Sequence, residues 1–515
     1  MIKKSFVRKE QYYDSVFLMR LAARLGTMPG IIQISSGMGT PLNKATMRDL
    51  GVLDENGEGA GVNDLVVGIA ADTMEQAQAA FDEFSRLIRE QPEKPADLPH
   101  TIEQAVRENP GIDLALIGTA GDYAADEGMK ALKKGLNVYM FSDNVPLEQE
   151  IALKKYAKEH GLLMMGPDCG LCMLDGIAIG LCSKTRRGTI GIAAASGSGM
   201  QEVMCIIHRN GFGISQAIGT GGRDLSDEVG GITMLQGIDI LESDPDTKVI
   251  VLISKPPSEC TLKAVLERVQ RCSKPTVVQF IHADPEMIRT YGAYPTGTFL
   301  ETAEAAMAFA GGSTPKPHSV TAPADDAFRF ARALSGEQKY LRGIYCGGSL
   351  AEETLTLALD RLNPLYSNVA FGEVKALPDA RISRGHCLID IGAEEFTRGR
   401  PHAAIDPSIR IARFEQEARD PETAVILMDV LLGYSLYEDP GGMLAPVISR
   451  EREKAAKDGR SLSVVIALCG TDLDPQGYEK QKECLEKAGA AVLYSNEEAS
   501  MLALEILRIK KEADR

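Results

Sequence analysis

The sequence predicts a multidomain α/β protein whose sheets are largely parallel. Short, nearly continuous apolar strands alternate with helical stretches along most of the chain, and each strand of the central region ends in a polar or glycine turn. The third observation is the length. A chain of 515 residues is too long to fold around one hydrophobic core, and at roughly 150 residues per domain it predicts three or four domains.

Residues 1–98 are expected to form a small α/β domain that ends in a polar, proline-containing linker at 91–99. Its elements follow from apolar periodicity: a strand at 5–9, a helix at 14–25, strands at 31–35 and 64–70, and a helix at 74–89.

Residues 99–186 are expected to form a second domain with strands at 113–117, 136–141 and 162–165. Ligands of parallel sheets bind beyond the carboxyl ends of the strands, so the three following turns are the expected ligand loops. We expect them to bind a small-molecule substrate through these residues: Gly121, Asp122, Tyr123, Ser142, Asn144, Pro167, Asp168 and Cys169.

Two further sheet-based domains are predicted at 187–312 and 339–515, joined by a linker at 313–338. The first has expected strands at 189–195, 215–219, 249–254 and 276–280, with a helix at 200–210. The second has expected strands at 340–345, 386–391, 424–428, 463–468 and 491–494, with a closing helix at 501–511.

Composition and charge exclude several classes of function for this chain. The formal net charge of −16 and the absence of tryptophan disfavour nucleic acid as a partner. The ten cysteines are not spaced like a secreted disulfide framework, and the start of the chain lacks the apolar core of a signal peptide. No apolar run approaches the ~18 residues of a membrane span, so we expect a cytoplasmic protein that acts on small molecules.

The turn Ser196–Gly199 between a strand and a helix is a candidate phosphate site. Free backbone N–H groups and the positive end of the helix dipole meet there, although a plain turn capped by serine explains the motif about as well. Gly221 and Gly222 of the loop 219–224 permit close backbone approach, and Arg223 offers a bidentate fork to an oxyanion.

A second cationic turn at 390–402 holds Arg398, Gly399, Arg400 and His402 and precedes a helix that is expected to begin near Pro407. Its alternative is a solvated loop whose charges pair with Glu394 and Glu395. Cys169 and Cys172 form a single CxxC pair without supporting histidines, so no metal site is expected. His208 and His282 are expected to be packed rather than catalytic.

Several segments together resemble the succinyl-CoA synthetases. The turn 166–170, the segment 189–200 and the loop 219–224 are similar to those of the α subunit, and the C-terminal third resembles the last domain of the β subunit. The FdrA family of synthetase-like proteins is a closer match, carried by the segments 38–44, 121–125, 141–145, 254–257, 399–402 and 471–475.

The resemblance implies a Rossmann-like domain of the CoA-binding type, two flavodoxin-like domains of the succinyl-CoA synthetase type and the small N-terminal domain. The chain departs from a true synthetase: 291–295 lacks the phosphate-relaying histidine, and 311–340 is too short for ATP-grasp machinery.

FdrA proteins act as one subunit of an oxamate carbamoyltransferase, which cleaves oxalurate with phosphate to oxamate and carbamoyl phosphate in allantoin and purine breakdown. The resemblance thus implies partner subunits, phosphate or carbamoyl phosphate as substrate, and no certain cofactor, with CoA a candidate. Phosphate would lie between two helix N-termini, at Ser196, Gly197, Ser198, Gly199, Gly221, Gly222, Arg398 and Gly399. Catalytic roles would fall to Ser196, Arg223, Arg400 and His402.

Two alternatives remain at this point. One is an NDP-forming acyl-CoA ligase that acts with a separate ATP-grasp partner, and the other is a non-catalytic CoA-binding or scaffold subunit.

Overall fold

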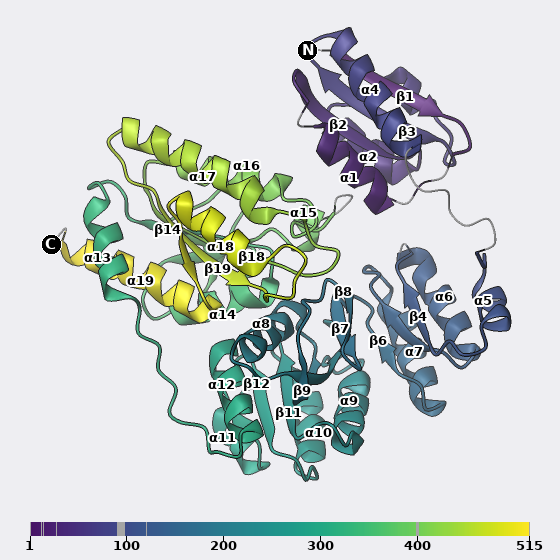
Figure 1. Cartoon of the computed structure of the whole chain (residues 1–515), viewed down its shortest axis with the longest axis vertical. Helices are drawn as coiled ribbons and strands as arrows, with labels where there is room; N and C mark the ends of the chain where they lie inside the picture. The colour runs from purple at the N-terminus through teal and green to yellow at the C-terminus, as the bar shows by residue number, and fades with distance from the viewer. Residues whose placement is uncertain are drawn as a thin grey trace. The chain divides into compact units, whose positions relative to one another are not determined.

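A computed structural model describes residues 2–11, 13, 15–26, 28–89, 98–119, 121–397 and 401–513 (Figure 1). The chain divides into two compact units. The first comprises Met1–Leu98 with Ile391–Ile409, and the second comprises Pro99–Asp390 with Arg410–Arg515. The first unit therefore includes a segment that lies far away in the sequence, between two strands of the second unit.

The first unit is built on a three-stranded antiparallel sheet in the order β1-β3-β2. The central strand β3 is buried along its whole length, and apolar side chains of α1 and α4, including Leu18 and Phe84, pack against it. The elements are β1 (Ile2–Arg8), α1 (Ser15–Leu25), β2 (Ile31–Met38), α2 (Pro41–Asp49), α3 (Glu55–Glu58), β3 (Leu65–Ala71), α4 (Met74–Arg89) and α15 (Glu394–Thr397).

The second unit begins with a three-stranded parallel sheet in the order β4-β5-β6. Short apolar strands alternate here with helices, as the sequence predicts for a parallel sheet. The elements are α5 (Ile102–Glu108), β4 (Leu114–Ile117), α6 (Gly121–Lys133), β5 (Asn137–Met140), α7 (Leu147–Glu159) and β6 (Met164–Met165).

A seven-stranded sheet follows in the order β13-β12-β11-β9-β10-β7-β8. Its strands are β7 (Leu171–Leu174), β8 (Ile177–Gly180), β9 (Arg187–Ala194), β10 (Ile214–Gly219), β11 (Val249–Ser254), β12 (Thr276–Phe280) and β13 (Tyr294–Pro295). Its helices are α8 (Gly197–Arg209), α9 (Ile232–Ser243), α10 (Glu259–Val269), α11 (Pro285–Thr290) and α12 (Phe299–Ala310). The hairpin β7–β8, which the sequence analysis did not anticipate, is antiparallel and extends this sheet through β10.

The last sheet is parallel throughout, in the order β16-β15-β17-β14-β18-β19-β20. Its strands are β14 (Tyr340–Tyr345), β15 (Leu365–Ser367), β16 (Lys375–Ala376), β17 (His386–Asp390), β18 (Thr423–Leu431), β19 (Ser463–Cys469) and β20 (Ala491–Leu493). Its helices are α13 (Ala324–Ala333), α14 (Gly348–Ala358), α16 (Ser408–Arg419), α17 (Pro440–Lys457), α18 (Tyr478–Lys487) and α19 (Asn496–Ala513).

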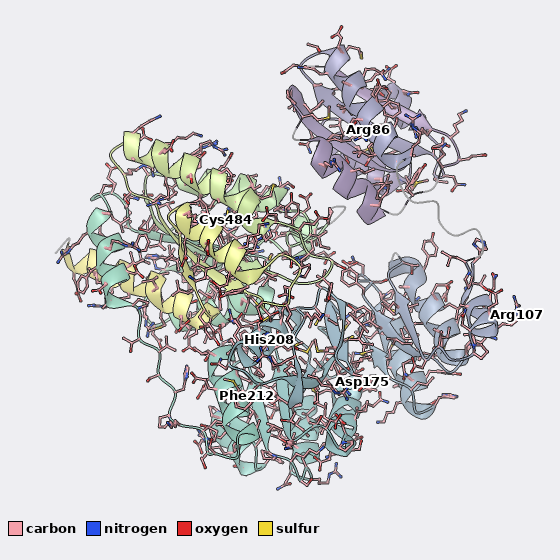
Figure 2. The ribbon with its side chains drawn as sticks, in the orientation of Figure 1. Arg86, Arg107, Asp175, His208, Phe212 and Cys484 are labelled. Atoms are coloured by element: carbon pink, nitrogen blue, oxygen red, sulfur yellow. The ribbon has the colours of Figure 1, made fainter. Side chains whose placement is uncertain are left out.

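The two seven-stranded sheets share one apolar core, with α8, α12, α14 and α19 among its helices. Polar contacts also join them: His208 on α8, labelled in Figure 2, lies 2.6 Å through Nε2 from Oδ1 of Asp472, just after β19. His208 is thus a packed histidine, as expected, whereas His282 is exposed, contrary to the expectation that it is packed. The predicted multidomain α/β class with parallel sheets is confirmed. Among the helices described, none combines the length and apolar character needed to cross a membrane.

Candidate functional site

The first turn of α8 lies directly beyond strand β9. Ser196 caps the helix, because its Oγ accepts a hydrogen bond from the Gly199 N–H at 3.2 Å. The backbone N–H groups of Gly197 and Ser198 have no hydrogen-bond partner among the described residues. Those two donors and the helix dipole leave this turn able to hold an anion.

The start of α14 meets the start of α8. The buried Ser196 hydroxyl donates a 2.7 Å hydrogen bond to the Ser349 Oγ. Gly347 packs so closely that a Cβ there would lie 2.9 Å from the Cβ of Ser198. Two helix N-termini therefore converge, one from each seven-stranded sheet.

A carboxylate of the protein itself already occupies part of the α14 turn. Asp429 accepts hydrogen bonds from the N–H of Cys346 at 3.0 Å and from the N–H of Gly347 at 2.7 Å. The buried Arg410 neutralises this carboxylate through a 2.9 Å ion pair. Asp429 therefore binds only the two amides that precede α14, and the N–H groups of Gly348 and Ser349 on α14, like those of Gly197 and Ser198 on α8, have no hydrogen-bond partner among the described residues.

Lys255 supplies positive charge at the same edge. This exposed residue follows β11, and its Nζ lies 3.6 Å from the position that a Cβ on Gly348 would take. The Asp390 carboxylate lies 2.8 Å from that position. Burial raises the pKa values of Asp168 and Glu352, and the Lys255 charge opposes that rise. Lys255 therefore acts on one group from the loop after β6 and on one from α14.

The three turns expected to bind substrate or CoA come together at the end of the sheet β4-β5-β6. Gly121 leaves no room for a side chain, because a Cβ would lie 2.3 Å from the Asp143 carbonyl oxygen. The Asp168 N–H donates to the Ser142 carbonyl at 2.9 Å. Asn144 and Asp168 both adopt left-handed φ angles, of 55° and 57°. Gly121 is the first residue of α6, Tyr123 is exposed, and the Asp122 side chain lies outside the described set.

The loop 219–224 packs onto the turn 166–169. Gly221 has a φ of 87°, and a Cβ there would lie 2.3 Å from the Pro167 carbonyl oxygen. Gly222 lies beside the Asp168 carboxylate. Asp168 reaches the surface, but protein atoms crowd its carboxylate, and this loss of hydration together with Asp143 raises its pKa to about 6.

Arg223 is engaged within the protein. It donates to the Val145 carbonyl at 2.7 Å and pairs with Glu150 at 2.8 Å. Glu150 in turn contacts the buried Lys154, whose Nζ lies 2.7 Å from Asp224 and 2.9 Å from the Thr220 carbonyl. This network fixes the glycine loop against α7.

Cys169 is a packing residue in this structure. Its Sγ donates weak hydrogen bonds to the carbonyls of Leu171 and Gly219, at 3.4 and 3.5 Å. Burial raises the pKa of the thiol well above its usual value, so the reactive thiolate is disfavoured. Burial raises the pKa of the Cys172 thiol as well.

The second predicted cationic turn, at 390–402, lies mostly in the first unit. Arg398, Gly399 and Arg400 lie outside the described residues. His402 belongs to the segment of the first unit, where its Nδ1 accepts from the Ala404 N–H at 3.2 Å. In its place, the structure pairs α8 with the turn 346–350, whose strand–glycine–serine–helix pattern resembles 195–200. Four residues near these helix starts were not among the site residues predicted from the sequence: Lys255, Ser349, Arg410 and Asp429.

Three family models match the chain. Residues 1–120 match the AllF heavy metal-associated domain, residues 185–282 match the CoA binding domain, and residues 344–506 match the CoA-ligase.

The residues present do not fit a heavy-metal site in the first of these regions. Residues 1–120 hold no cysteine, and His100 is their one histidine, so the thiolate ligands that soft metal ions prefer are lacking. The described part of the chain also contains no cluster of three or more His, Cys, Asp or Glu side chains placed to hold a metal ion.

The relatives agree with the family models. The chain is 39% identical over 514 residues to YahF of Escherichia coli, covering 99% of both chains. It is 30% identical over 162 residues to the α subunit of the ADP-forming succinate–CoA ligase of Aquifex aeolicus, which is 30% of this chain and 52% of that one. The chain thus spans about half the length of that subunit.

Among solved structures, the dinucleotide-forming acetyl-coenzyme A synthetase 1 of Ca. Korarchaeum cryptofilum aligns with a TM-score of 0.34 and 14% identity, over 82% of this chain and 88% of that one. The full-length match to YahF decides the family. The chain belongs to the same family as YahF and has a succinyl-CoA synthetase-like organisation, with an AllF-type N-terminal domain followed by CoA-binding and CoA-ligase domains.

Proposed function

We propose that the chain is the phosphate-binding subunit of an oxamate carbamoyltransferase, which converts oxalurate and phosphate to oxamate and carbamoyl phosphate. The observation that carries the proposal is the Ser196–Ser349 contact, which joins the starts of α8 and α14 and leaves amide donors of α8 open. The likeness to the FdrA family supplies the substrate.

In the proposed reaction, phosphate binds to the N–H groups of Gly197 and Ser198. One phosphate oxygen attacks the carbamoyl carbon of oxalurate and forms a C–O bond. The carbonyl oxygen becomes an oxyanion, which the Lys255 ammonium stabilises from the end of β11. Ser196 acts as a positioning residue, because its hydroxyl already donates to the Ser349 Oγ at the start of α14 and accepts from the Gly199 N–H at the start of α8.

Collapse of this intermediate breaks the C–N bond and releases oxamate, whose nitrogen takes up one proton. Asp168 is the proposed donor, because its raised pKa of about 6 keeps a fraction of the carboxyl protonated near neutral pH. Arg223, Arg398, Gly399, Arg400 and His402 remain proposed contacts for phosphate or for the oxamate carboxylate. The turns around Gly121, Ser142 and Pro167 remain the proposed site for the organic substrate or CoA.

The test is to reconstitute the chain with its partner subunits and follow transfer of labelled phosphate into carbamoyl phosphate. Lys255→Gln should lower kcat/KM at least tenfold, which equals a loss of about 1.4 kcal/mol in transition-state binding. Lys263→Gln is the matched control, because Lys263 is an exposed lysine on α10 of the same sheet. Equal rates for the two variants, or no phosphate-dependent product in any complex, would contradict the proposal.

A second candidate is an NDP-forming acyl-CoA ligase that works with a separate ATP-grasp partner. The match of residues 185–282 to the CoA binding domain and the likeness to an ADP-forming succinate–CoA ligase subunit favour it. Labelled ATP separates the two candidates. A ligase must consume ATP when CoA and an acid are present, whereas the transferase needs only phosphate and oxalurate.

A further inference from the structure

A cavity of about 860 Å³ lies in the last sheet, away from the candidate site. Its lining includes Tyr340 and His386, the first residues of strands β14 and β17. Gly347 and Asp390 of the candidate site lie at the other ends of the same two strands. The cavity is therefore at the amino edge of the sheet, and its volume falls within the roughly 300–1,000 Å³ of small-molecule pockets.

Most of the wall surface is apolar. Leu504 and Leu507 of α19 are buried, as is Leu362, which lies between α14 and β15. Val320 and Ala322 close the cavity from the segment that precedes α13. A wall of this kind takes the apolar body of a ligand.

Basic side chains border the aliphatic wall. The lining contains five cations and one carboxylate, Glu505: the cations are Lys339, Arg361, Arg508, Lys510 and Lys511. Glu422 pairs with Lys339 and Glu512 with Arg508, whereas neither Arg361 nor Lys511 has an ion pair among the described residues, so this border keeps an excess of positive charge. In a chain of net charge −16, this excess favours an anionic group on the ligand.

His386 adds a neutral donor. Its Nδ1 accepts the Leu341 N–H at 3.2 Å, so the proton of the neutral ring is on Nε2. Burial, with Arg342 and Lys511 nearby, lowers the pKa of His386 to about 4, so the ring stays neutral at physiological pH.

The aromatic groups are not free to stack on a nucleobase. The Lys339 Nζ lies 5.1 Å from the Tyr340 ring centroid, and the Arg342 guanidinium lies 5.2 Å from it. The ring also meets His386 edge to face, at 5.3 Å between centroids. These contacts favour a flexible aliphatic body over a planar one.

We propose that this cavity binds an aliphatic carboxylate of medium chain length, with its chain against Leu504 and Leu507 and its carboxylate at the basic border near Lys511. This ligand site is separate from the site of the proposed function and does not depend on that function.

Titration calorimetry of the full chain with decanoate is the test, since the absence of tryptophan removes the usual fluorescence signal. Two matched ligands accompany it. Decyltrimethylammonium has the same chain length with the opposite charge and should bind at least tenfold more weakly. Adenosine monophosphate carries a nucleobase and an anion and should not displace decanoate.

Two variants locate the binding. Ala322→Phe fills the cavity from a half-buried position and should weaken decanoate binding about tenfold. Lys511→Glu should weaken it about fivefold, whereas Lys487→Glu on the exposed face of α18 should change nothing. Thermal unfolding of each variant checks that it is folded.

The proposal is overturned if decanoate does not bind the unaltered chain, if the cationic chain binds equally well, or if adenosine monophosphate displaces decanoate. Unchanged affinity in folded Ala322→Phe would overturn it as well.

Discussion

The Ser196 hydroxyl donates a 2.7 Å hydrogen bond to the Ser349 Oγ across 153 positions of sequence, and both side chains are buried. The same Ser196 oxygen accepts the Gly199 N–H. One serine therefore caps its own helix and ties that helix to the start of another.

Ser196→Ala removes both interactions. Loss of the cap should cost about 1 kcal/mol, and the buried Ser349 hydroxyl left without this partner should add about 1–2 kcal/mol. Urea unfolding of the single and double variants with Ser349→Ala should give a coupling energy near 1 kcal/mol. Thr101→Ala, which removes an exposed cap on α5, is the control and should show the cap loss alone. Additive effects of Ser196→Ala and Ser349→Ala would contradict the pairing.

Gly221→Ala tests the close approach of the glycine loop to the turn 166–169. The new Cβ would meet the Pro167 carbonyl oxygen at 2.3 Å in addition to the strain of a left-handed φ. Gly230→Ala is the control, because Gly230 has a φ of 72° and no atom within 4 Å of the added Cβ. The free energy of unfolding of the control should fall by about 1–2 kcal/mol from backbone strain alone. Gly221→Ala should lower it clearly more, because the steric clash adds to the strain. Equal losses in thermal unfolding would show that the loop moves away freely.

Lys154→Met tests the buried network behind the loop. It leaves the carboxylates of Glu150 and Asp224 buried without their shared cation, so unfolding free energy should fall by about 3–5 kcal/mol, nearer the lower value because Arg223 still pairs with Glu150. Lys155→Met alters the exposed neighbouring lysine and should stay within about 0.5 kcal/mol. Denaturant unfolding of both variants makes the comparison. A neutral Lys154→Met would show that the two carboxylates are satisfied without the lysine.

Asp168→Asn should flatten the pH dependence of stability. The folded protein raises the pKa of Asp168 from 3.8 to about 6, so it favours the protonated carboxyl. The contribution of this group is therefore fully present at low pH and is lost as pH rises through this interval. Asparagine tolerates the left-handed φ of this position and removes the titration.

Relative to the unaltered chain, Asp168→Asn should gain stability between pH 4 and 7, as measured by urea unfolding at each pH. The exposed Asp227→Asn serves as the control. A parallel pH profile for Asp168→Asn and the unaltered chain would mean that Asp168 titrates normally.

The sequence predicted the central strands well. The ranges 249–254, 276–280 and 340–345 agree with β11, β12 and β14, because parallel strands covered on both faces are continuous apolar runs. The hairpin β7–β8 was missed, although its turn, Asp175-Gly176, has positive φ at both residues and is a recognisable hairpin signal.

The site was harder to predict than the fold. The local signal of a strand, a glycine turn and a helix identified Ser196–Gly199, and strand order explains why the turns around Gly121, Ser142 and Asp168 meet. The partner of Ser196 is set by the packing of two sheets, which no short motif encodes. Lys255 is an exposed lysine in no recognisable site motif, and only its position near Gly348 and Asp390 of the last sheet connects it with the site.

The Lys154 network also bears on how this unit unfolds. Lys154 lies on α7, which packs with the three-stranded sheet β4-β5-β6. Asp224 and the Thr220 carbonyl lie on the loop after β10 of the adjoining seven-stranded sheet. Separating the two would leave charged groups without partners on both new surfaces. We therefore expect the three-stranded sheet and the adjoining seven-stranded sheet to melt in one cooperative step, and a fragment cut between them to fold poorly.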